Sequence, residues 1–202
     1  MLRLETVSSG TLALTRRLLA LPALSQTRLV GGTALALQLG HRISVDLDLF
    51  GPWDERIDLG EELSACGVVE DAGGSGKMRF FVVDGVKVDC VSYPHPWLDP
   101  PTCEDGLRLA SVRDIAAMKL SAVTSRGSRK DFVDLAFLLG TISLREMMSL
   151  FREKYPGANE YIVLRSLTYF VDAEAQPLPT MLVPFDWDKA KDDIRTAVKA
   201  LA

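Results

Sequence analysis

GGTALALQLGHRISVDLDLF, residues 31–50, is the stretch that decides the fold class. After two glycines, a short apolar run predicts a helix over 33–39, and an apolar strand is predicted over 43–50. Asp46 and Asp48 interrupt this strand, although a carboxylate is costly to remove from water unless a cation meets it. Because strand residues two apart point to the same face, the two carboxylates are expected side by side.

Two adjacent carboxylates of this kind predict a metal site. Mg²⁺ prefers oxygen ligands and commonly joins one or two carboxylates to the phosphates of a substrate. Metal ions held in this way stabilise the attacking and leaving oxygens of a phosphoryl transfer. Asp46 and Asp48 therefore predict a site for Mg²⁺ or Mn²⁺, delivered with a nucleoside triphosphate. The alternative is a chance Asp-x-Asp at a solvated strand end, which the pattern taken by itself favours.

The residues around the acidic strand favour the metal site. Gly31, Gly32 and Thr33 follow a predicted strand and open a predicted helix, where main-chain N–H groups attract anions and glycine lets a phosphate approach closely. The Thr33 hydroxyl is a further candidate donor. Arg42, in the turn before the acidic strand, is placed either to bind a phosphate or to neutralise Asp48.

The segment KMRFFVVDGVKVDCVSY, residues 77–93, predicts a β-hairpin with Asp84-Gly85 as its two-residue turn. The alternation of its second strand places Lys87 and Asp89 on one face. If this hairpin pairs with the acidic strand, Asp89 reaches the same site, where it is a candidate general base or second metal ligand. The alternative is an exposed aspartate beside Lys87.

A second group of charges lies in the carboxyl-terminal half. Lys119 falls within the apolar arc of a predicted helix over 112–125, and Arg126 falls in the same arc directly after it. Asp131 and Asp134 share one face of the next predicted helix. Two explanations remain open. The four residues form a structural network between antiparallel helices, or Lys119 and Arg126 meet a triphosphate while the aspartates orient them.

The order of the predicted elements, with strands in the first half and only helices from residue 111 onward, indicates an α+β protein of two lobes. The chain has 202 residues, of which 48% are hydrophobic, and a net charge of −4, which argues against a general nucleic-acid coat. We expect a mixed sheet lobe with flanking helices over 1–108 and an all-helical lobe over 109–202 that closes the active-site cleft. Residues 71–76 are predicted as a loop and 93–106 as a proline-rich connector. Three scattered cysteines, and no run long enough to span a membrane, predict a cytoplasmic protein.

Two segments of the chain resemble motifs of a known family. Residues 31–50 resemble the leading motif of the AbiEii/MenT-type nucleotidyltransferases, toxins of bacterial toxin–antitoxin and abortive-infection systems, within the DNA polymerase β-like superfamily. Residues 109–139, LASVRDIAAMKLSAVTSRGSRKDFVDLAFLL, resemble the Lys-containing helix and the Lys-Asp-x-x-Asp-Leu helix of the same family. One departure is Gly-Gly-Thr where the superfamily more often has Gly-Ser.

The resemblance implies a role for each matching residue. It makes Gly32 and Thr33 part of the nucleotide-phosphate motif, Asp46 and Asp48 the metal carboxylates, and Lys119 a phosphate contact, with Asp131 and Asp134 completing the site. It also implies a nucleotidyltransferase-like fold for the mixed sheet lobe over 1–108. It further implies transfer of a nucleotide to a tRNA acceptor end, or GTP binding, and a separately encoded antitoxin as partner.

Three functions are therefore compared. The first is a Mg²⁺-dependent nucleotidyltransferase that moves NMP from an NTP to a hydroxyl acceptor. Its expected acceptor is tRNA, and its expected biological role is that of a toxin. The second is a similar enzyme with a small-molecule acceptor, which the acidic net charge favours because RNA binding needs phosphate-neutralising cations. The third is a non-catalytic nucleotide-binding or protein-interaction module on the same fold.

Overall fold

The computed structural model describes residues 1–201 and divides into two compact units. The sheet unit comprises Met1–His95 and Pro100–Ala110, and the helical unit comprises Pro96–Asp99 and the chain from Ser111 onward. The change from strands to helices thus comes at Ala110–Ser111, and the short segment Pro96–Asp99 of the connector belongs to the helical unit.

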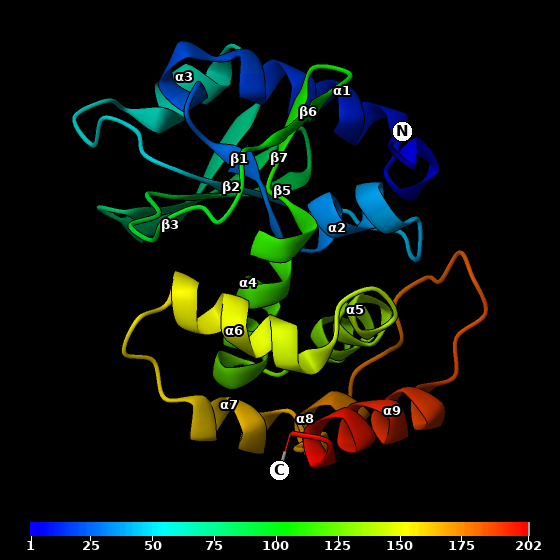
Figure 1. Ribbon diagram of the computed structural model, residues 1–202. Coiled ribbons are helices and arrows are strands. Elements are labelled where there is room, and N and C mark those ends of the chain that lie inside the picture. Colours follow the sequence, from blue (N-terminus) through cyan, green and yellow to red (C-terminus); the bar gives the residue numbers. More distant parts are fainter. Residues whose placement is uncertain (202) are drawn as a thin grey trace. The chain divides into compact units, whose positions relative to one another are not determined.

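The sheet unit is built on one mixed seven-stranded sheet with the strand order β3-β4-β5-β2-β1-β7-β6 (Figure 1). β2 pairs with β5 in parallel and with β1 antiparallel, and β1 pairs with β7 in parallel. The predicted α+β class, with a mixed sheet followed by helices, is confirmed. The strands are β1 Arg28–Leu29, β2 Leu47–Phe50, β3 Val69–Ser75, β4 Met78–Val83, β5 Val86–Val91, β6 Thr102–Glu104 and β7 Leu107–Leu109.

The acidic strand is shorter than predicted. β2 covers Leu47–Phe50, so that Asp46 lies just before it. Leu47 and Leu49 are completely buried, while Asp48 and Phe50 on the other face are half-buried. The alternation therefore anchors one face of β2 in the core and leaves the carboxylate of Asp48 on the more open face.

The predicted hairpin is confirmed by β4 and β5, which pair antiparallel from Val83↔Val86 to Met78↔Val91. Asp84 and Gly85 form the turn, with φ of 48° and 78°. Positive φ at both central residues matches the twist of the flanking strands, which is why Asp-Gly is favoured there.

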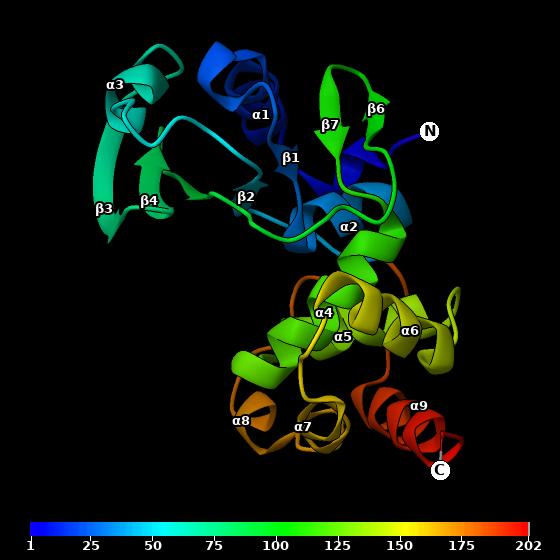
Figure 2. The ribbon, with the colours of Figure 1, turned by 60° about the vertical axis from the view of Figure 1, so that its left-hand side comes forward.

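Two segments predicted without regular structure are strands. Residues 71–76 were expected to form a loop, but β3 extends through Ser75 and pairs with β4, with a register shift between Asp71 and Gly73. Within the predicted connector, β6 forms a hairpin with β7 (Figure 2). Pairing with a neighbouring strand supplies hydrogen bonds that overcome the weak intrinsic strand preference of these glycine- and proline-rich segments.

Short helices flank the sheet. α1 begins after Ser8, whose side chain accepts from the N–H of Thr11, and α3 begins after Asp58, which accepts from the N–H groups of Gly60 and Glu61. This cap sets the start of α3, so that residues 54–57 lie outside the helix. The helices of the sheet unit are η1 Leu4–Thr6, α1 Ser9–Ala20, η2 Pro22–Leu24, α2 Gly31–Leu39 and α3 Leu59–Ser64.

The helical unit has a core of apolar residues from α4, α5 and α6, including Ile115, Phe132 and Met147. The Ser111 side chain caps α4 by accepting from the N–H of Asp114, and the Ser143 side chain caps α6 by accepting from the N–H of Glu146. After α6 the chain forms two short helices, α7 and α8. Among residues 1–201, no helix is long and apolar enough to cross a membrane. The helices are α4 Val112–Ser125, α5 Arg129–Leu139, α6 Leu144–Lys154, α7 Glu160–Ser166, α8 Val171–Glu174 and α9 Trp187–Lys199.

Candidate active site

The sheet unit brings the predicted carboxylates together. β2 and β5 are parallel neighbours with Asp48 directly opposite Asp89 in the register. Paired residues on neighbouring strands point to the same face, so these two side chains are adjacent. Asp46 lies two residues before Asp48, and its charge acts on the same lysine, Lys87, as do those of Asp48 and Asp89. The strand pairing on which the expectation for Asp89 depended is therefore present.

Gly31 is in direct contact with the acidic strand. A Cβ atom at Gly31 would lie 2.1 Å from Oδ2 and 3.0 Å from Cγ of Asp48, and the φ of Gly31 is +66°. Only glycine leaves room for the carboxylate at this distance and adopts this backbone conformation without strain. The main chain also joins the two elements, because the N–H of Val30 donates to the carbonyl oxygen of Asp48 at 2.9 Å. The first turn of α2 and the Asp48 carboxylate thus form one fixed arrangement.

We predict that Gly31→Ala displaces the Asp48 carboxylate. The added methyl group meets Oδ2 and the positive φ becomes unfavourable, so we expect a loss of about 1–3 kcal/mol in the free energy of unfolding. Metal-dependent nucleotide binding should fall at the same time. Gly10→Ala is the matched control, because its Cβ would meet only Ser8 Oγ at 3.9 Å within α1. Urea unfolding and calorimetric titration of both variants check this, and a Gly31→Ala protein with unchanged stability and binding would contradict it.

Thr33 is placed to hold the acidic segment. Its side chain is buried, and its Oγ1 atom forms hydrogen bonds with the Ser44 hydroxyl at 2.8 Å and with the main-chain carbonyl oxygen of Asp46. The hydroxyl proposed as a phosphate donor is therefore engaged by the segment that carries Asp46. Gly32 is the second residue of α2, between Gly31 and Thr33.

Lys87 forms an ion pair with Asp89. Its Nζ atom is 2.7 Å from Oδ2, and the two side chains are 55% and 16% exposed. The hydrogen bond to Asp89 raises the pKa of Lys87, and the charges of Asp89, Asp48 and Asp46 raise it further, against the opposing effect of burial. Oδ1 of Asp89 is buried and has no hydrogen-bond partner among the described residues. One oxygen of this carboxylate is thus bound by a lysine, and the other is left for a ligand.

Arg42 is buried, with 3% of its surface exposed. Its Nη1 atom donates to the carbonyl oxygen of Ile43 at 3.0 Å. The guanidinium group is therefore held against the segment that leads into β2.

The helical unit brings Lys119, Asp131 and Asp134 together. Nζ of Lys119 is 3.0 Å from Oδ1 of Asp131 and 2.5 Å from Oδ2 of Asp134. The side chain of Lys119 is 4% exposed and both aspartates are fully buried. The ion-pair network between α4 and α5, one of the two expectations, is present in this unit.

Arg126 and Ser128 bind the same aspartate. Arg126 donates through Nε to Oδ2 of Asp131 at 2.8 Å and through Nη2 to Oδ1 at 2.9 Å, and the Ser128 hydroxyl donates to Oδ2 at 2.5 Å. Burial alone would raise the pKa of Asp131, but the charge of Lys119 and the hydrogen bonds from Arg126 and Ser128 lower it well below its usual range. Asp131 is therefore a fully ionised, fully coordinated carboxylate.

This unit contains a second buried ion pair, which was not predicted from the sequence. Lys154 Nζ lies 2.7 Å from Oδ1 of Asp114 and 2.8 Å from the carbonyl oxygen of Pro96. Asp114 also accepts from the N–H of Leu98 at 2.9 Å, so the pair fixes Pro96–Asp99 to the helices. Lys154 lies in the apolar stripe of α6, the same signal that identified Lys119 in α4.

The donor atoms suit a metal held jointly with a nucleotide. No group of three or more His, Cys, Asp or Glu side chains among residues 1–201 is arranged to hold a metal ion by itself. Mg²⁺ usually takes one or two carboxylates and completes its shell with water and substrate phosphates. The partnerless oxygen of Asp89, directly opposite Asp48 in the strand register, fits such an ion.

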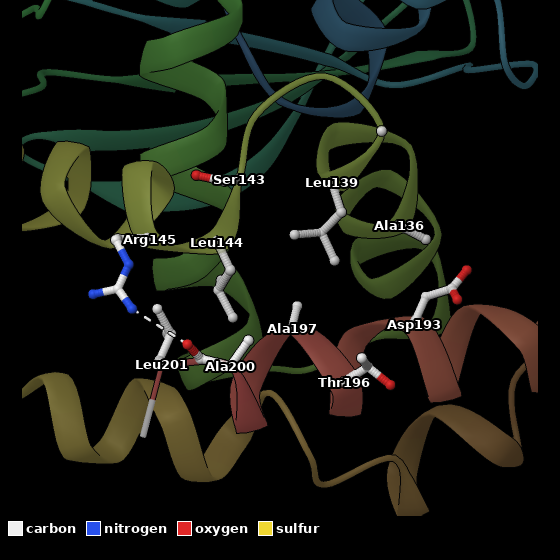
Figure 3. A pocket seen from close by; sticks show the side chains of 11 residues that line it. Ala136, Leu139, Ser143, Leu144, Arg145, Asp193, Thr196, Ala197, Ala200 and Leu201 are labelled. Atoms are coloured by element: carbon white, nitrogen blue, oxygen red, sulfur yellow. Dashed lines mark hydrogen bonds between the residues drawn. The ribbon is translucent and has the colours of Figure 1, made fainter.

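A hollow of about 570 Å³ lies within the helical unit, between α5, α6 and α9 (Figure 3). Apolar side chains such as Leu139 and Leu144 dominate its wall, and Arg145 Nη2 donates to the carbonyl oxygen of Ala200 at its edge. None of its lining residues is a predicted site residue. It carries none of the chemistry described above.

Comparison with known proteins assigns the family. Residues 12–200 match the model of the family described as "Nucleotidyl transferase AbiEii toxin, Type IV TA system". An uncharacterized protein of Aquifex aeolicus (strain VF5) is 33% identical over 179 residues, which are 85% of each chain. Two solved structures share the fold. JHP933 of Helicobacter pylori has a TM-score of 0.59 at 17% identity, covering 96% of this chain and 93% of its own. MenT4, a nucleotidyltransferase toxin of Mycobacterium tuberculosis H37Rv, has a TM-score of 0.57 at 16% identity, covering 95% of this chain and 84% of its own. The expected resemblance is confirmed, and the chain belongs to the AbiEii family of nucleotidyltransferase toxins.

Proposed function

We propose that the protein is a Mg²⁺- or Mn²⁺-dependent toxin that transfers NMP from an NTP to a hydroxyl group of RNA, with tRNA as the first candidate acceptor. The observation that carries this proposal is the in-register pair Asp48 and Asp89, with the Asp48 carboxylate packed against Gly31 at the start of α2. A protein that uses this unit only for packing gains nothing from placing two carboxylates side by side, because like charges directly opposite are destabilising.

In the proposed site, Asp46 and Asp48 hold the metal ion. When bound, the ion neutralises charge on the triphosphate and stabilises the attacking and leaving oxygens. The main-chain N–H groups at Gly31 and Gly32, at the start of α2, face the phosphates, where a helix end favours anions. Thr33 holds the Asp46 segment through its buried hydroxyl. Arg42 holds the same segment by donating to the carbonyl oxygen of Ile43.

Asp89 is proposed to receive the proton of the acceptor hydroxyl, or to hold a second metal ion. The acceptor oxygen bonds to the α-phosphorus, and the bond from that phosphorus to the oxygen shared with the β-phosphate breaks. Pyrophosphate leaves, and the proton passes to the carboxylate. The oxygen of Asp89 without a hydrogen-bond partner is the one available for this step.

In the helical unit, Lys119 and Arg126 are proposed as phosphate contacts that Asp131 and Asp134 orient. The short distances from Lys119 to both aspartates support the orienting part of this role. The competing proposal is that the four residues only stabilise α4 against α5, which the burial of Lys119, Asp131 and Asp134 favours. The substitution of Lys119 treated in the Discussion separates the two.

The family also implies a partner. We propose that a separately encoded antitoxin counteracts the enzyme, and that both act in the cytoplasm. The three cysteines, of which Cys66 and Cys90 are buried and Cys103 is exposed, form no disulfide, in keeping with that compartment.

The test of the proposal is nucleotide transfer by the purified chain. Protein is incubated with each labelled NTP, Mg²⁺ or Mn²⁺, and total tRNA, with Asp48→Ala as the inactive control. We expect label on RNA from at least one NTP, dependent on the metal and absent with the control. A wild-type protein that labels nothing and shows no metal-dependent NTP binding would remove the enzymatic proposal.

A small-molecule acceptor is the second candidate, favoured by the net charge of −4. Small hydroxyl compounds added to the same reaction would compete with tRNA for the label if this candidate holds. A non-catalytic nucleotide-binding or protein-interaction module is the third. It predicts that Asp46→Asn leaves the effect of the induced protein on growth intact, whereas the enzymatic proposal predicts that the effect disappears.

A further inference from the structure

Lys87 is the cation that the structure places on the third carboxylate of the proposed site. It lies two residues before Asp89 on β5, and both side chains point to the face of the sheet that carries Asp48. Its Nζ atom is 2.7 Å from Oδ2 of Asp89. The family resemblance assigns no role to this lysine.

The charges around Lys87 explain why it takes this position. Without a metal ion, Asp46, Asp48 and Asp89 place three negative charges near Lys87, and each of them acts on its ammonium group. An ammonium group among these carboxylates offsets their mutual repulsion. It also engages one of the two oxygens of Asp89 that a metal ion would use.

We infer that Lys87 is a built-in counter-ion that competes with the free divalent cation for the acidic site, so that the site binds metal weakly until a nucleotide arrives. The inference rests on the metal site of the proposed function. A divalent cation must displace the ammonium group or tolerate a like charge within a few ångströms. Displacement is feasible, because the side chain is 55% exposed and ends a flexible four-carbon stem.

Binding of Mn²⁺ alone to the full chain, without nucleotide, tests this inference. Titration calorimetry and electron paramagnetic resonance of free Mn²⁺ give the dissociation constant at low salt. We expect Lys87→Met to bind Mn²⁺ about tenfold more tightly than the wild type, the change expected for removing one unit charge about 6 Å from a divalent ion in water-like surroundings. Lys87→Arg, which keeps the charge, should stay close to the wild type.

Lys189→Met is the matched control, because Lys189 also pairs with an aspartate, Asp193 at 2.5 Å, but lies on α9 in the helical unit. It should leave the dissociation constant unchanged. A Lys87→Met protein that binds Mn²⁺ as weakly as the wild type, or more weakly, would overturn the inference. The second result would instead make Lys87 a group that positions Asp89 for the metal.

The experiments distinguish a failure of this inference from a failure of the proposed function. Adding Asp48→Asn to Lys87→Met should abolish the gain in Mn²⁺ affinity, which places the gain at this site. If the wild type transfers nucleotide but Lys87→Met binds Mn²⁺ unchanged, the inference fails and the proposed function stands. If Lys87→Met gains affinity through Asp48 while no NTP is transferred, the inference stands and the proposed function fails.

Discussion

Asp48→Asn is expected to lower the rate of nucleotide transfer on the order of a thousandfold or more, since removing one stabilising group from a transition state already costs about a hundred- to a thousandfold. The change keeps the shape of the side chain but removes the charge that lies opposite Asp89 and beside Gly31. An amide oxygen is a much poorer ligand for Mg²⁺ than a carboxylate, so the metal and the triphosphate it carries lose their anchor.

The fold should tolerate this substitution. Asp48 is half-buried at the open face of β2, and the neutral amide removes a negative charge from a group of three. We therefore expect an unfolding midpoint at or above that of the wild type. Thermal unfolding, together with the transfer assay, separates a lost site from a lost fold.

Asp71→Asn is the matched control, because Asp71 lies on β3 with a 56% exposed side chain and pairs with Arg79 at 2.9 Å. It should keep full transfer activity. An Asp48→Asn protein that retains activity within a few-fold of the wild type would show that this carboxylate holds no catalytic metal.

Local pattern was sufficient to predict the acidic strand and the hairpin. The alternation of buried Leu47 and Leu49 with Asp48 follows directly from a strand with one face in the core. Asp84-Gly85 predicted its turn because few other residue pairs adopt two successive positive φ values. The parallel pairing of β2 with β5, which brings Asp89 beside Asp48, is a contact between distant segments and could only be stated as a condition.

The missed strands show where local pattern stops being informative. β3 contains Gly73 and Gly74 with φ of 105° and 92°, and the Cβ of a residue at 74 would lie 2.2 Å from the carbonyl oxygen of Met78. Of the glycines that suggested a loop, Gly74 is required here by the close approach of β4, and Gly73 by its positive φ. Strand β6 is only three residues long and is held by pairing with β7.

The site residues also divide into those whose role the sequence predicts and those whose role depends on tertiary contacts. The type and spacing of Asp46 and Asp48 indicated oxygen ligands, but the buried hydroxyl of Thr33 could be assigned to the Asp46 carbonyl only from coordinates. The cations of the helical unit were recognised where they fell in an apolar arc, as Lys119 did. Lys154 met the same criterion, and its pairing with Asp114 depended on packing between α4 and α6.

Lys119→Met is expected to lower the free energy of unfolding by about 3–5 kcal/mol at pH 7, because it leaves two buried carboxylates without their shared cation. Asp131 keeps Arg126 and Ser128, whereas Asp134 loses an ion pair of 2.5 Å. Methionine fills much of the space of the lysine stem, so the loss reports charge more than a cavity. Urea unfolding of the wild type and the variant measures it.

The pH dependence identifies the cause. The pKa of Asp131 is lower in the folded protein than its usual 3.8, so its contribution to stability is present above about pH 4 and is lost as the pH falls through the folded-state pKa. Below pH 4 the stability difference between the wild type and Lys119→Met should therefore narrow, as the carboxylates that lost their cation become protonated. A difference that stays constant on acidification would point to packing instead.

Lys130→Met, at an exposed position of the same helix α5 that carries Asp131, should change stability by no more than about 0.5 kcal/mol. The transfer assay, run in conditions where Lys119→Met remains folded, separates the two roles of Lys119. Normal activity with reduced stability would restrict the network of Lys119, Asp131 and Asp134 to holding α4 against α5. Lost activity with the stability of the wild type would contradict the expected destabilisation. Removing a buried cation that two carboxylates share should lower the free energy of unfolding, so this result would mean that Lys119 serves the nucleotide and not the fold.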